Sequence, residues 1–297
     1  MTIKGIVTNK IQGFYYVESQ NQVYECRLRG LLKRSDRKKN CVVGDIVEFS
    51  SEGTIDNIYL RKNLLERPLV ANIDYILIQF ACKNPDIDYD KLNILLLNSF
   101  YYNIIPVVVI NKIDLITEEE SKVLKENLKF LEDINIECFF ISRNKNIGID
   151  KIKNFLNGHI SAFSGPSGVG KSSIINILQD DVKMETGEIS IKLKIGKHTT
   201  KGAKLIKFGD NGYIIDTPGF SSIELPDIEN KEKFINLFPE FTKVEKSCKF
   251  LNCRHVNEPG CIIKQMVEEG KIAPTRYEFY LKNYKKLSDT RWSKYEK

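Results

Sequence analysis

Residues 165–172 carry the clearest chemistry in this chain, because they read GPSGVGKS and fit GxxxxGKS/T, the pattern of a phosphate-binding loop. An apolar run precedes them and a helical pattern follows, which is the context that such a loop needs. Glycines let the backbone wrap around phosphate, and N–H groups at the helix start donate to its oxygens. Lys171 places a positive charge at the β- and γ-phosphates, and the Ser172 hydroxyl suits Mg²⁺. The pattern predicts a nucleotide site formed by Gly165, Pro166, Ser167, Gly168, Val169, Gly170, Lys171 and Ser172.

A second motif, NKID at residues 111–114, predicts which base is bound. An ionised Asp114 accepts hydrogen bonds from the two donors of guanine, N1–H and the exocyclic amine. Adenine offers an acceptor at N1 and would leave the carboxylate unpaired, and an unpaired buried charge is costly. We expect Asn111 and Lys112 to brace this loop and flank the base. Ser142 ends the next apolar run, where we expect the last base-contacting loop.

A third motif, DTPG at residues 216–219, lies downstream of the phosphate-binding loop. Asp216 ends an apolar run and is placed to hold Mg²⁺, usually through water. Gly219 leaves its backbone N–H free to meet the γ-phosphate, so this motif predicts the part of the site that senses hydrolysis.

Between the phosphate-binding loop and the DTPG motif, residues 196–200 read GKHTT. A GTPase needs a threonine here that reaches Mg²⁺ and the γ-phosphate; either Thr199 or Thr200 fits, and we favour Thr200. His198 is either a catalytic or switch residue or an exposed loop histidine. Phe220 occupies the position where Ras-like enzymes place the glutamine that orients water. Phenylalanine makes no such hydrogen bond, so we expect slow turnover without a partner.

Four candidate metal ligands lie close together near the C-terminus, in the spacing C-x4-C-x-H-x5-C. They stand out in a chain with seven cysteines and three histidines. Three thiolates and one imidazole suit a tetrahedral Zn²⁺ ion with no open position, which makes the site structural. The alternative is a group of buried thiols without metal. The expected ligands are Cys248, Cys253, His255 and Cys261.

The order of the motifs is unusual, because the base motif precedes the phosphate-binding loop. In a Ras-like GTPase the loop comes first, followed by DxxG and then NKxD. All parts are present here, but the chain is cut and rejoined elsewhere, as in a circular permutation. The new order fixes where added domains attach. It also leads us to expect that the nucleotide state at Gly219 acts on the domain that follows.

The patterning predicts a multidomain α/β protein with three domains: an OB-fold domain at residues 1–68 that binds RNA, a circularly permuted GTPase domain at 69–225, and a zinc-binding domain at 226–297. Short β-type runs at the start suggest a barrel of the OB type. Strands then alternate with helical patterns, which indicates a mainly parallel sheet covered on both faces. The last part reads as mostly helical.

Several local expectations accompany this organisation. We expect one helix over residues 117–132 and a tight hairpin turn at Asn211-Gly212. In the final helix, which we expect from residue 274, a stripe of apolar and tyrosine residues at helical spacing predicts a packing face. Residues 33–39 form a basic loop, which is either a solvated loop or a grip on a phosphate backbone. The stripe comprises Tyr277, Tyr280, Leu281, Tyr284 and Leu287.

Composition limits the partners and the location. The hydrophobic share of 42% supports real cores, and the net charge of +6 permits a polyanionic partner such as RNA without requiring one. No apolar run is long enough to span a membrane, and the start has no apolar stretch of a signal peptide. We expect a cytoplasmic monomer that does not bind membranes.

Taken together, NKID, GPSGVGKSS, GKHTT, DTPGF and CKFLNCRHVNEPGC make the chain resemble the RsgA family of circularly permuted GTPases, also called YjeQ or YloQ. The likeness covers essentially the whole length. It implies an enzyme of late 30S ribosomal subunit maturation that binds 16S rRNA and hydrolyses GTP to GDP and phosphate with stimulation by the subunit. It extends the nucleotide site to Ser173 and implies a switch role for His198. The family pattern departs at Lys201 and Arg143.

Two other functions were open from the sequence. One is a P-loop ATPase or kinase, against which NKxD argues. The other is an RNA-binding module that uses GTP only as a structural ligand. The leading hypothesis is a Mg²⁺-dependent GTPase in which His198, Lys171 and Thr200 act in catalysis, Ser172 and Thr200 hold magnesium, and one zinc ion is structural.

Overall fold

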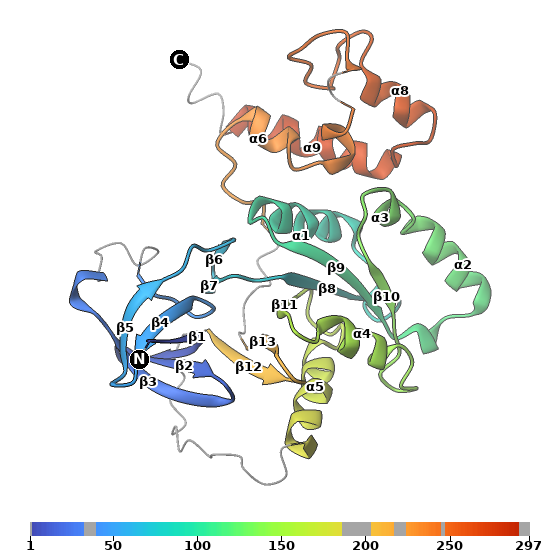
Figure 1. Cartoon of the computed structure of the whole chain (residues 1–297). Helices are drawn as coiled ribbons and strands as arrows, with labels where there is room; N and C mark the ends of the chain where they lie inside the picture. Colours follow the sequence, from blue (N-terminus) through green and yellow to red (C-terminus); the bar gives the residue numbers. More distant parts are fainter. Residues whose placement is uncertain (1, 33–39, 186–202, 217–223, 245–246, 291–297) are drawn as a thin grey trace.

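The computed structural model describes residues 2–32, 40–185, 203–216, 224–244 and 247–290. Three bodies are visible in Figure 1: a barrel, a central sheet covered by helices, and a helical domain at the C-terminal end. Within these ranges no helix is long and apolar enough to cross a membrane.

The N-terminal part is a small closed barrel whose strands are hydrogen-bonded in the order β1-β2-β3-β5-β4. Alternate side chains of β2 point inward, as expected for strands with one buried face. Val7, Val17, Val47, Phe49 and Ile55 fill the interior and are fully buried. The expectation of an OB-type barrel is therefore confirmed. Its strands are β1 (Thr2–Ile11), β2 (Phe14–Ser19), β3 (Gln22–Leu28), β4 (Ile46–Ser50) and β5 (Thr54–Ile58), with a 3-10 turn η1 at Gly30–Leu32.

A short hairpin, β6 (Leu64–Glu66) and β7 (Leu69–Ala71), leads from the barrel to the sheet. The barrel also contacts the edge strand β12 (Lys204–Phe208) of that sheet. There the Lys207 ammonium lies 2.8 Å from a Glu18 carboxylate oxygen and 2.6 Å from the Asn21 side-chain oxygen. A charged contact thus joins the barrel to the sheet edge.

The central sheet has six strands in the order β10-β9-β8-β11-β13-β12. All neighbours run parallel except β12 and β13, which form an antiparallel hairpin. The chain builds outward from β8 through β9 to β10 and then crosses to β11 on the other side of β8. Ligands of open α/β sheets bind at the carboxyl ends of strands where the order reverses in this way. The remaining strands are β8 (Tyr75–Ala81), β9 (Ile105–Asn111), β10 (Cys138–Phe140), β11 (Ile160–Ser164) and β13 (Gly212–Asp216).

Helices cover both faces of this sheet, as the sequence predicts. On one face α1 buries Leu92, Leu95 and Leu96 in a core shared with β8 and β9. On the other face α4 and α5 pack over Leu77 and Val109. Figure 1 shows the two layers above and below the strands. The helices are α1 (Tyr89–Tyr101), α2 (Glu118–Asn127), α3 (Phe130–Asp133), α4 (Ile149–Leu156) and α5 (Lys171–Glu185), with a 3-10 turn η3 at Ile113–Leu115.

Two local expectations were wrong in detail. The single helix expected over 117–132 is divided into α2 and α3. Its start is well specified, because Thr117 and Glu120 form a reciprocal capping box. The predicted tight hairpin between β12 and β13 is present, but its turn consists of residues 209–211, since Gly212 already pairs with Phe208 as the first residue of β13.

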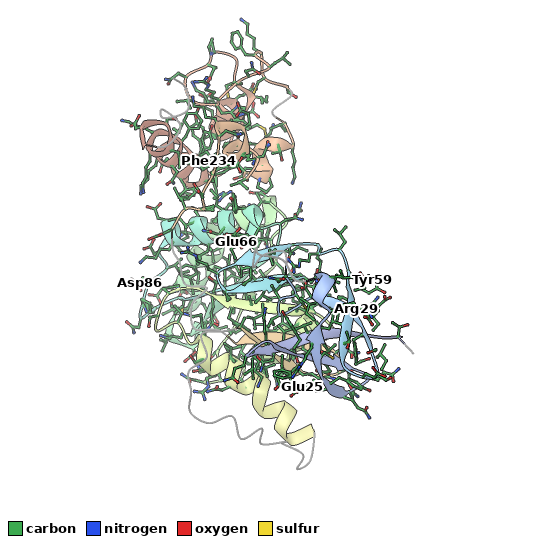
Figure 2. All side chains as sticks on the ribbon, turned by 90° about the vertical axis from the view of Figure 1, so that its left-hand side faces the viewer. Glu25, Arg29, Tyr59, Glu66, Asp86 and Phe234 are labelled. Atoms are coloured by element: carbon green, nitrogen blue, oxygen red, sulfur yellow. The ribbon has the colours of Figure 1, made fainter. Side chains whose placement is uncertain are left out.

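The C-terminal domain is held together by a core of aromatic rings. Phe234, Phe238, Phe241 and Tyr280 are fully buried, and Figure 2 shows Phe234 inside this domain. The predicted stripe of the last helix is a packing face, with Tyr280, Tyr284 and Leu287 buried in that core and Tyr277 and Leu281 partly buried against it. The helices are α6 (Lys231–Ile235), α7 (Pro239–Thr242), α8 (Ile262–Glu268) and α9 (Pro274–Thr290).

This domain docks on α1 of the central layer. Arg276 of α9 is buried, and its guanidinium donates to a Glu240 carboxylate oxygen and to the Asn93 side-chain oxygen, each at 2.8 Å. Asn98 donates to the Glu224 carbonyl oxygen at 2.9 Å, and the Tyr101 hydroxyl donates to that of Asp227 at 3.0 Å. Helix α1 is therefore the platform for the C-terminal domain.

Replacing Arg276 with alanine should destabilise the C-terminal domain by about 3–5 kcal/mol, because it leaves the Glu240 carboxylate buried without its cation. Lys282→Ala is the matched control. Lys282 lies in α9, as Arg276 does, and pairs with Asp90 of α1, but both of these side chains are more than half exposed. Exposed pairs contribute little. Denaturant unfolding followed by tyrosine fluorescence measures both variants, and equal effects would contradict the assignment.

Candidate nucleotide site and metal centre

The predicted phosphate-binding loop lies between β11, which ends at Ser164, and α5, which begins at Lys171. Its glycines adopt backbone angles that other residues avoid: φ is +130° at Gly165, +80° at Gly168 and +96° at Gly170. A Cβ atom at Gly165 would lie 2.1 Å from the Gln79 carbonyl oxygen, so the loop begins in direct contact with β8. The local sequence therefore permits a turn that a side chain would block.

The Lys171 side chain points back into this loop. Its ammonium donates to the carbonyl oxygens of Gly165 at 2.8 Å and Pro166 at 2.5 Å. Burial lowers the pKa of Lys171 from its ordinary value. A cation in such a partly buried position is suited to an anionic ligand, which offers better charge compensation than carbonyl dipoles. Ser172 is exposed and Ser173 half-buried at the start of α5.

The base motif and the phosphate loop meet at one carbonyl group. Asn111, the last residue of β9, donates from its side-chain amide to the Val169 carbonyl oxygen at 3.0 Å. Gln79 of β8 donates to the same oxygen, also at 3.0 Å. The sequence patterns did not identify Gln79, because it lies within the otherwise apolar run at residues 75–81. A single amide within such a run was the available signal.

The rest of the base motif forms a braced turn. Lys112 adopts φ of 64°, and its ammonium donates to the Asn84 carbonyl oxygen. Its own carbonyl oxygen accepts from the Cys82 thiol at 2.9 Å. Asn111 accepts from the backbone N–H of Lys112 at 2.7 Å. The segment after β8 therefore supports the turn after β9 from the side.

Asp114 and Ser142 lie together, as the base-site hypothesis requires. The buried Ser142 hydroxyl donates to an Asp114 carboxylate oxygen at 2.5 Å and accepts from the backbone N–H of Lys145 at 3.1 Å. The Ser142 hydrogen bond, supported by the Asn144 amide and the Lys145 charge, holds the pKa of Asp114 below its ordinary value. The carboxylate is therefore ionised at neutral pH and able to accept from two guanine donors.

Several predicted residues lie outside the described ranges. These are His198, Thr199, Thr200, Gly219 and Phe220, and also the basic loop 33–39. Asp216 ends β13, which pairs with β11 through Ile160 and Ser161 and so points toward the same sheet edge. Its place in the sheet is described, but its side chain is not.

The four predicted metal ligands form one cluster. The ligating atoms of Cys248, Cys253, His255 and Cys261 all lie within 4.8 Å of one another. The His255 Nδ1 atom is 3.7 Å from the Cys248 sulfur and 3.4 Å from the Cys261 sulfur. Zn–S bonds of about 2.3 Å at tetrahedral angles separate ligand atoms by about 3.8 Å. The donor set and its spacing fit one zinc ion held through Nδ1 of His255.

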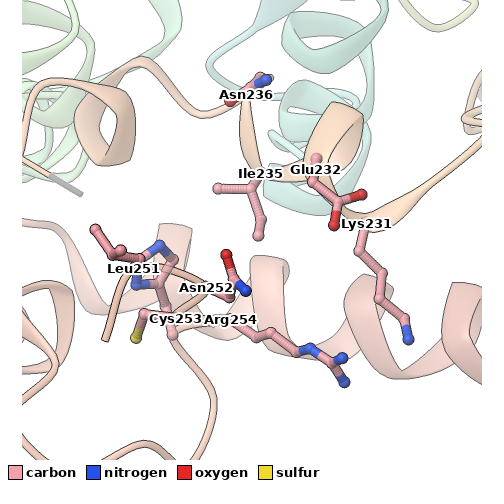
Figure 3. Close-up of a pocket in the computed structure, with 9 residues that line it drawn as sticks. Lys231, Glu232, Ile235, Asn236, Leu251, Asn252, Cys253 and Arg254 are labelled. Atoms are coloured by element: carbon pink, nitrogen blue, oxygen red, sulfur yellow. The ribbon is translucent and has the colours of Figure 1, made fainter. Parts of the chain in front are cut away.

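The surrounding core fixes this cluster. The Tyr277 hydroxyl donates to the His255 carbonyl oxygen at 2.8 Å, and the Tyr280 hydroxyl donates to that of Arg254. A cavity of about 480 Å³ adjoins the cluster between α6 and residues 251–255 (Figure 3). Its lining includes Cys253 and His255 but no predicted nucleotide residue. Three of the four donors are buried, Cys248 is half-buried, and all come from one short segment, which suits a structural ion.

Comparisons with known proteins agree with this geometry. The profile described as RsgA GTPase matches residues 57–226, and that of the RsgA N-terminal domain matches residues 4–56. A Fusobacterium nucleatum protein named small ribosomal subunit biogenesis GTPase RsgA is 57% identical over 285 residues, covering 96% of this chain and 99% of the relative. A protein of the same name from Clostridium beijerinckii is 42% identical over 296 residues, covering 99% of this chain and 100% of the relative.

Two solved structures share the fold along nearly the whole chain. YjeQ from Thermotoga maritima superposes with a TM-score of 0.82 at 33% sequence identity, covering 98% of this chain and 100% of that one. YloQ, described as a circularly permuted GTPase, superposes with a TM-score of 0.83 at 29% identity, covering 98% and 96%. The permuted order inferred from the motifs is therefore matched in three dimensions.

Replacing Asp114 with asparagine should exchange the preferred base. The new amide cannot accept from both guanine donors, so the dissociation constant for GDP should rise roughly tenfold to a hundredfold. Xanthine carries a carbonyl group in place of the amine, and asparagine complements it with one acceptor and one donor. Isothermal titration with GDP and xanthosine diphosphate measures this exchange. Retained GDP preference would contradict the assigned base site, and an unchanged melting temperature is the folding control.

Removing the metal should loosen the C-terminal domain first, because a structural zinc ion contributes directly to folding. After chelation, proteolysis within residues 247–290 should accelerate by about tenfold or more while GDP affinity changes little. Cys261→Ala should reproduce the effect, whereas Cys138→Ala, at a cysteine in β10 outside the cluster, should retain one metal ion per chain. Unchanged C-terminal protease resistance after verified metal loss would contradict a structural role.

Proposed function

The chain belongs to the RsgA family of GTPases, and we propose that it hydrolyses GTP during maturation of the small ribosomal subunit, with the motifs at 111–114, 165–173 and 216–219 forming its active site. The observation that carries the proposal is the shared contact of Asn111 with the phosphate loop at the Val169 carbonyl oxygen. One hydrogen bond links the part that selects guanine to the part that binds phosphate.

The roles of the described residues follow from their positions. Asp114, held ionised by Ser142, accepts from the guanine edge, and Lys112 flanks the base. The loop backbone and Lys171 bind the β- and γ-phosphates, so that charge developing during phosphoryl transfer meets fixed donors. Ser172, Thr200 and Asp216 would hold magnesium, which would neutralise phosphate charge.

The attacking water must be oriented by a hydrogen-bonding group, and the Phe220 side chain forms no hydrogen bond. We assign His198 as the switch residue that acts once the small subunit is bound, because it lies in the segment expected to contact the γ-phosphate. We further propose that the domain at 1–68 and the zinc domain at 226–297 flank the GTPase domain at 69–225 and bind 16S rRNA. The positive net charge favours such a partner. The protein then acts as a cytoplasmic monomer with one structural zinc ion.

Hydrolysis measured with and without purified 30S subunits tests this function. The protein alone should turn over slowly, with a rate constant on the order of 10⁻³ s⁻¹, as for GTPases that depend on a partner. Addition of 30S subunits should raise it by at least about tenfold, whereas 50S subunits should not. Lys171→Ala should abolish the stimulated rate because it removes charge at the transferred phosphate.

The same assay separates the alternatives. Displacement of bound GTP by ATP would indicate an ATPase or kinase instead. Subunit binding without phosphate release would indicate an RNA-binding module that uses GTP as a structural ligand. A fast single-turnover rate without subunits would contradict the expectation based on Phe220.

A further inference from the structure

Gln79 is a buried amide in an otherwise apolar part of the central strand β8. Its side chain is fully buried, and its neighbours Ile78 and Phe80 are buried apolar residues. Its amide nitrogen donates to Val169, but its side-chain oxygen is buried and has no hydrogen-bond partner within the described part of the chain. A buried polar atom without a partner opposes folding. An apolar residue at this position would be expected to favour folding more than the amide does. The amide therefore calls for a role other than stabilising the fold.

The same residue contacts the phosphate-binding loop at both ends. At the start, its backbone oxygen would lie 2.1 Å from a Cβ atom on Gly165. At the end, its side-chain amide holds the Val169 carbonyl group, and a Cβ atom on Gly170 would lie 3.5 Å from the amide nitrogen. One residue of the neighbouring strand therefore sets the distance between the sheet and each end of the loop.

The Val169 carbonyl oxygen has its full complement of donors. It accepts from Gln79 and from Asn111, each at 3.0 Å, and a carbonyl oxygen offers two lone pairs. The trans peptide group is planar, so its C=O and the following N–H point in opposite directions. Two donors that hold the carbonyl toward the ends of β8 and β9 therefore leave the Gly170 N–H pointing away from those strands.

We propose that Gln79 is a positioning residue for phosphate binding, which holds the Val169–Gly170 peptide so that its N–H faces the phosphate groups of a guanine nucleotide. The inference rests on the proposed GTPase function and deepens it. Gln79 acts through Val169 and does not touch the nucleotide. Because it extends from the sheet and not from the base motif, it keeps the loop preorganised before the base is bound.

Gln79→Met tests this role, since methionine has a similar volume but no donor or acceptor. The dissociation constant for GDP should rise about five- to tenfold through faster dissociation, as expected for one lost hydrogen bond. The melting temperature of the nucleotide-free protein should stay the same or rise, because the unpaired oxygen disappears as well. Ser161→Ala is the matched control: its hydroxyl is also buried without a partner among the described residues, but on β11 upstream of the loop. It should leave GDP affinity unchanged.

A double-mutant cycle with Asn111→Ala adds a readout that packing alone would not give. Because both amides serve one oxygen, losing both should weaken GDP binding more than the product of the single effects. Additive effects, or an unchanged dissociation constant in Gln79→Met, would overturn the proposal. Gln79→Leu replaces the methionine variant if that one does not fold. Failure of the wild-type protein to bind GDP would instead refute the nucleotide function itself.

Discussion

The contact between Asn111 and the Val169 carbonyl oxygen is the constraint on which the site depends, because it joins two strands that do not touch. β9 carries the base motif and β11 leads into the phosphate loop, but β8 lies between them. Only groups at the carboxyl ends of the strands can bridge that gap. The loop therefore folds over the end of β8, and glycine is required where it passes Gln79 and Asn111. The predicted base motif and the predicted phosphate loop therefore share one support.

The circular permutation leaves this arrangement intact, since strand pairing depends on neighbours in the sheet and not on chain order. It changes only where the other domains attach. The barrel joins through β7 at the amino end of β8, the edge away from the nucleotide site. The C-terminal domain follows the carboxyl end of β13, the edge that holds the phosphate loop. In the chain, the C-terminal domain therefore comes next after a strand end at the edge that holds the phosphate loop, and the barrel comes before a strand end at the opposite edge.

The sequence predicted what repeating patterns and spaced motifs encode, namely the barrel, the sheet, the permuted site and the Cys/His cluster. It did not predict contacts between distant side chains. The break between α2 and α3 lies next to Phe130 and Leu131, which are buried in the core, and helical periodicity does not reveal it. Gln79 and Arg276 are each one polar residue within an ordinary pattern. Their partners Val169 and Glu240 become neighbours only after the elements pack.

Helix α1 holds the C-terminal domain against the central sheet. Strand β13 pairs with β11 and β12 in the sheet. Further along the chain, the Glu224 carbonyl oxygen accepts a hydrogen bond from the Asn98 side chain of α1. The zinc domain is held on the same helix through the buried Arg276 and Asn93 pair. A movement of the C-terminal domain relative to the sheet must therefore break these contacts or carry α1, which follows β8 in the chain.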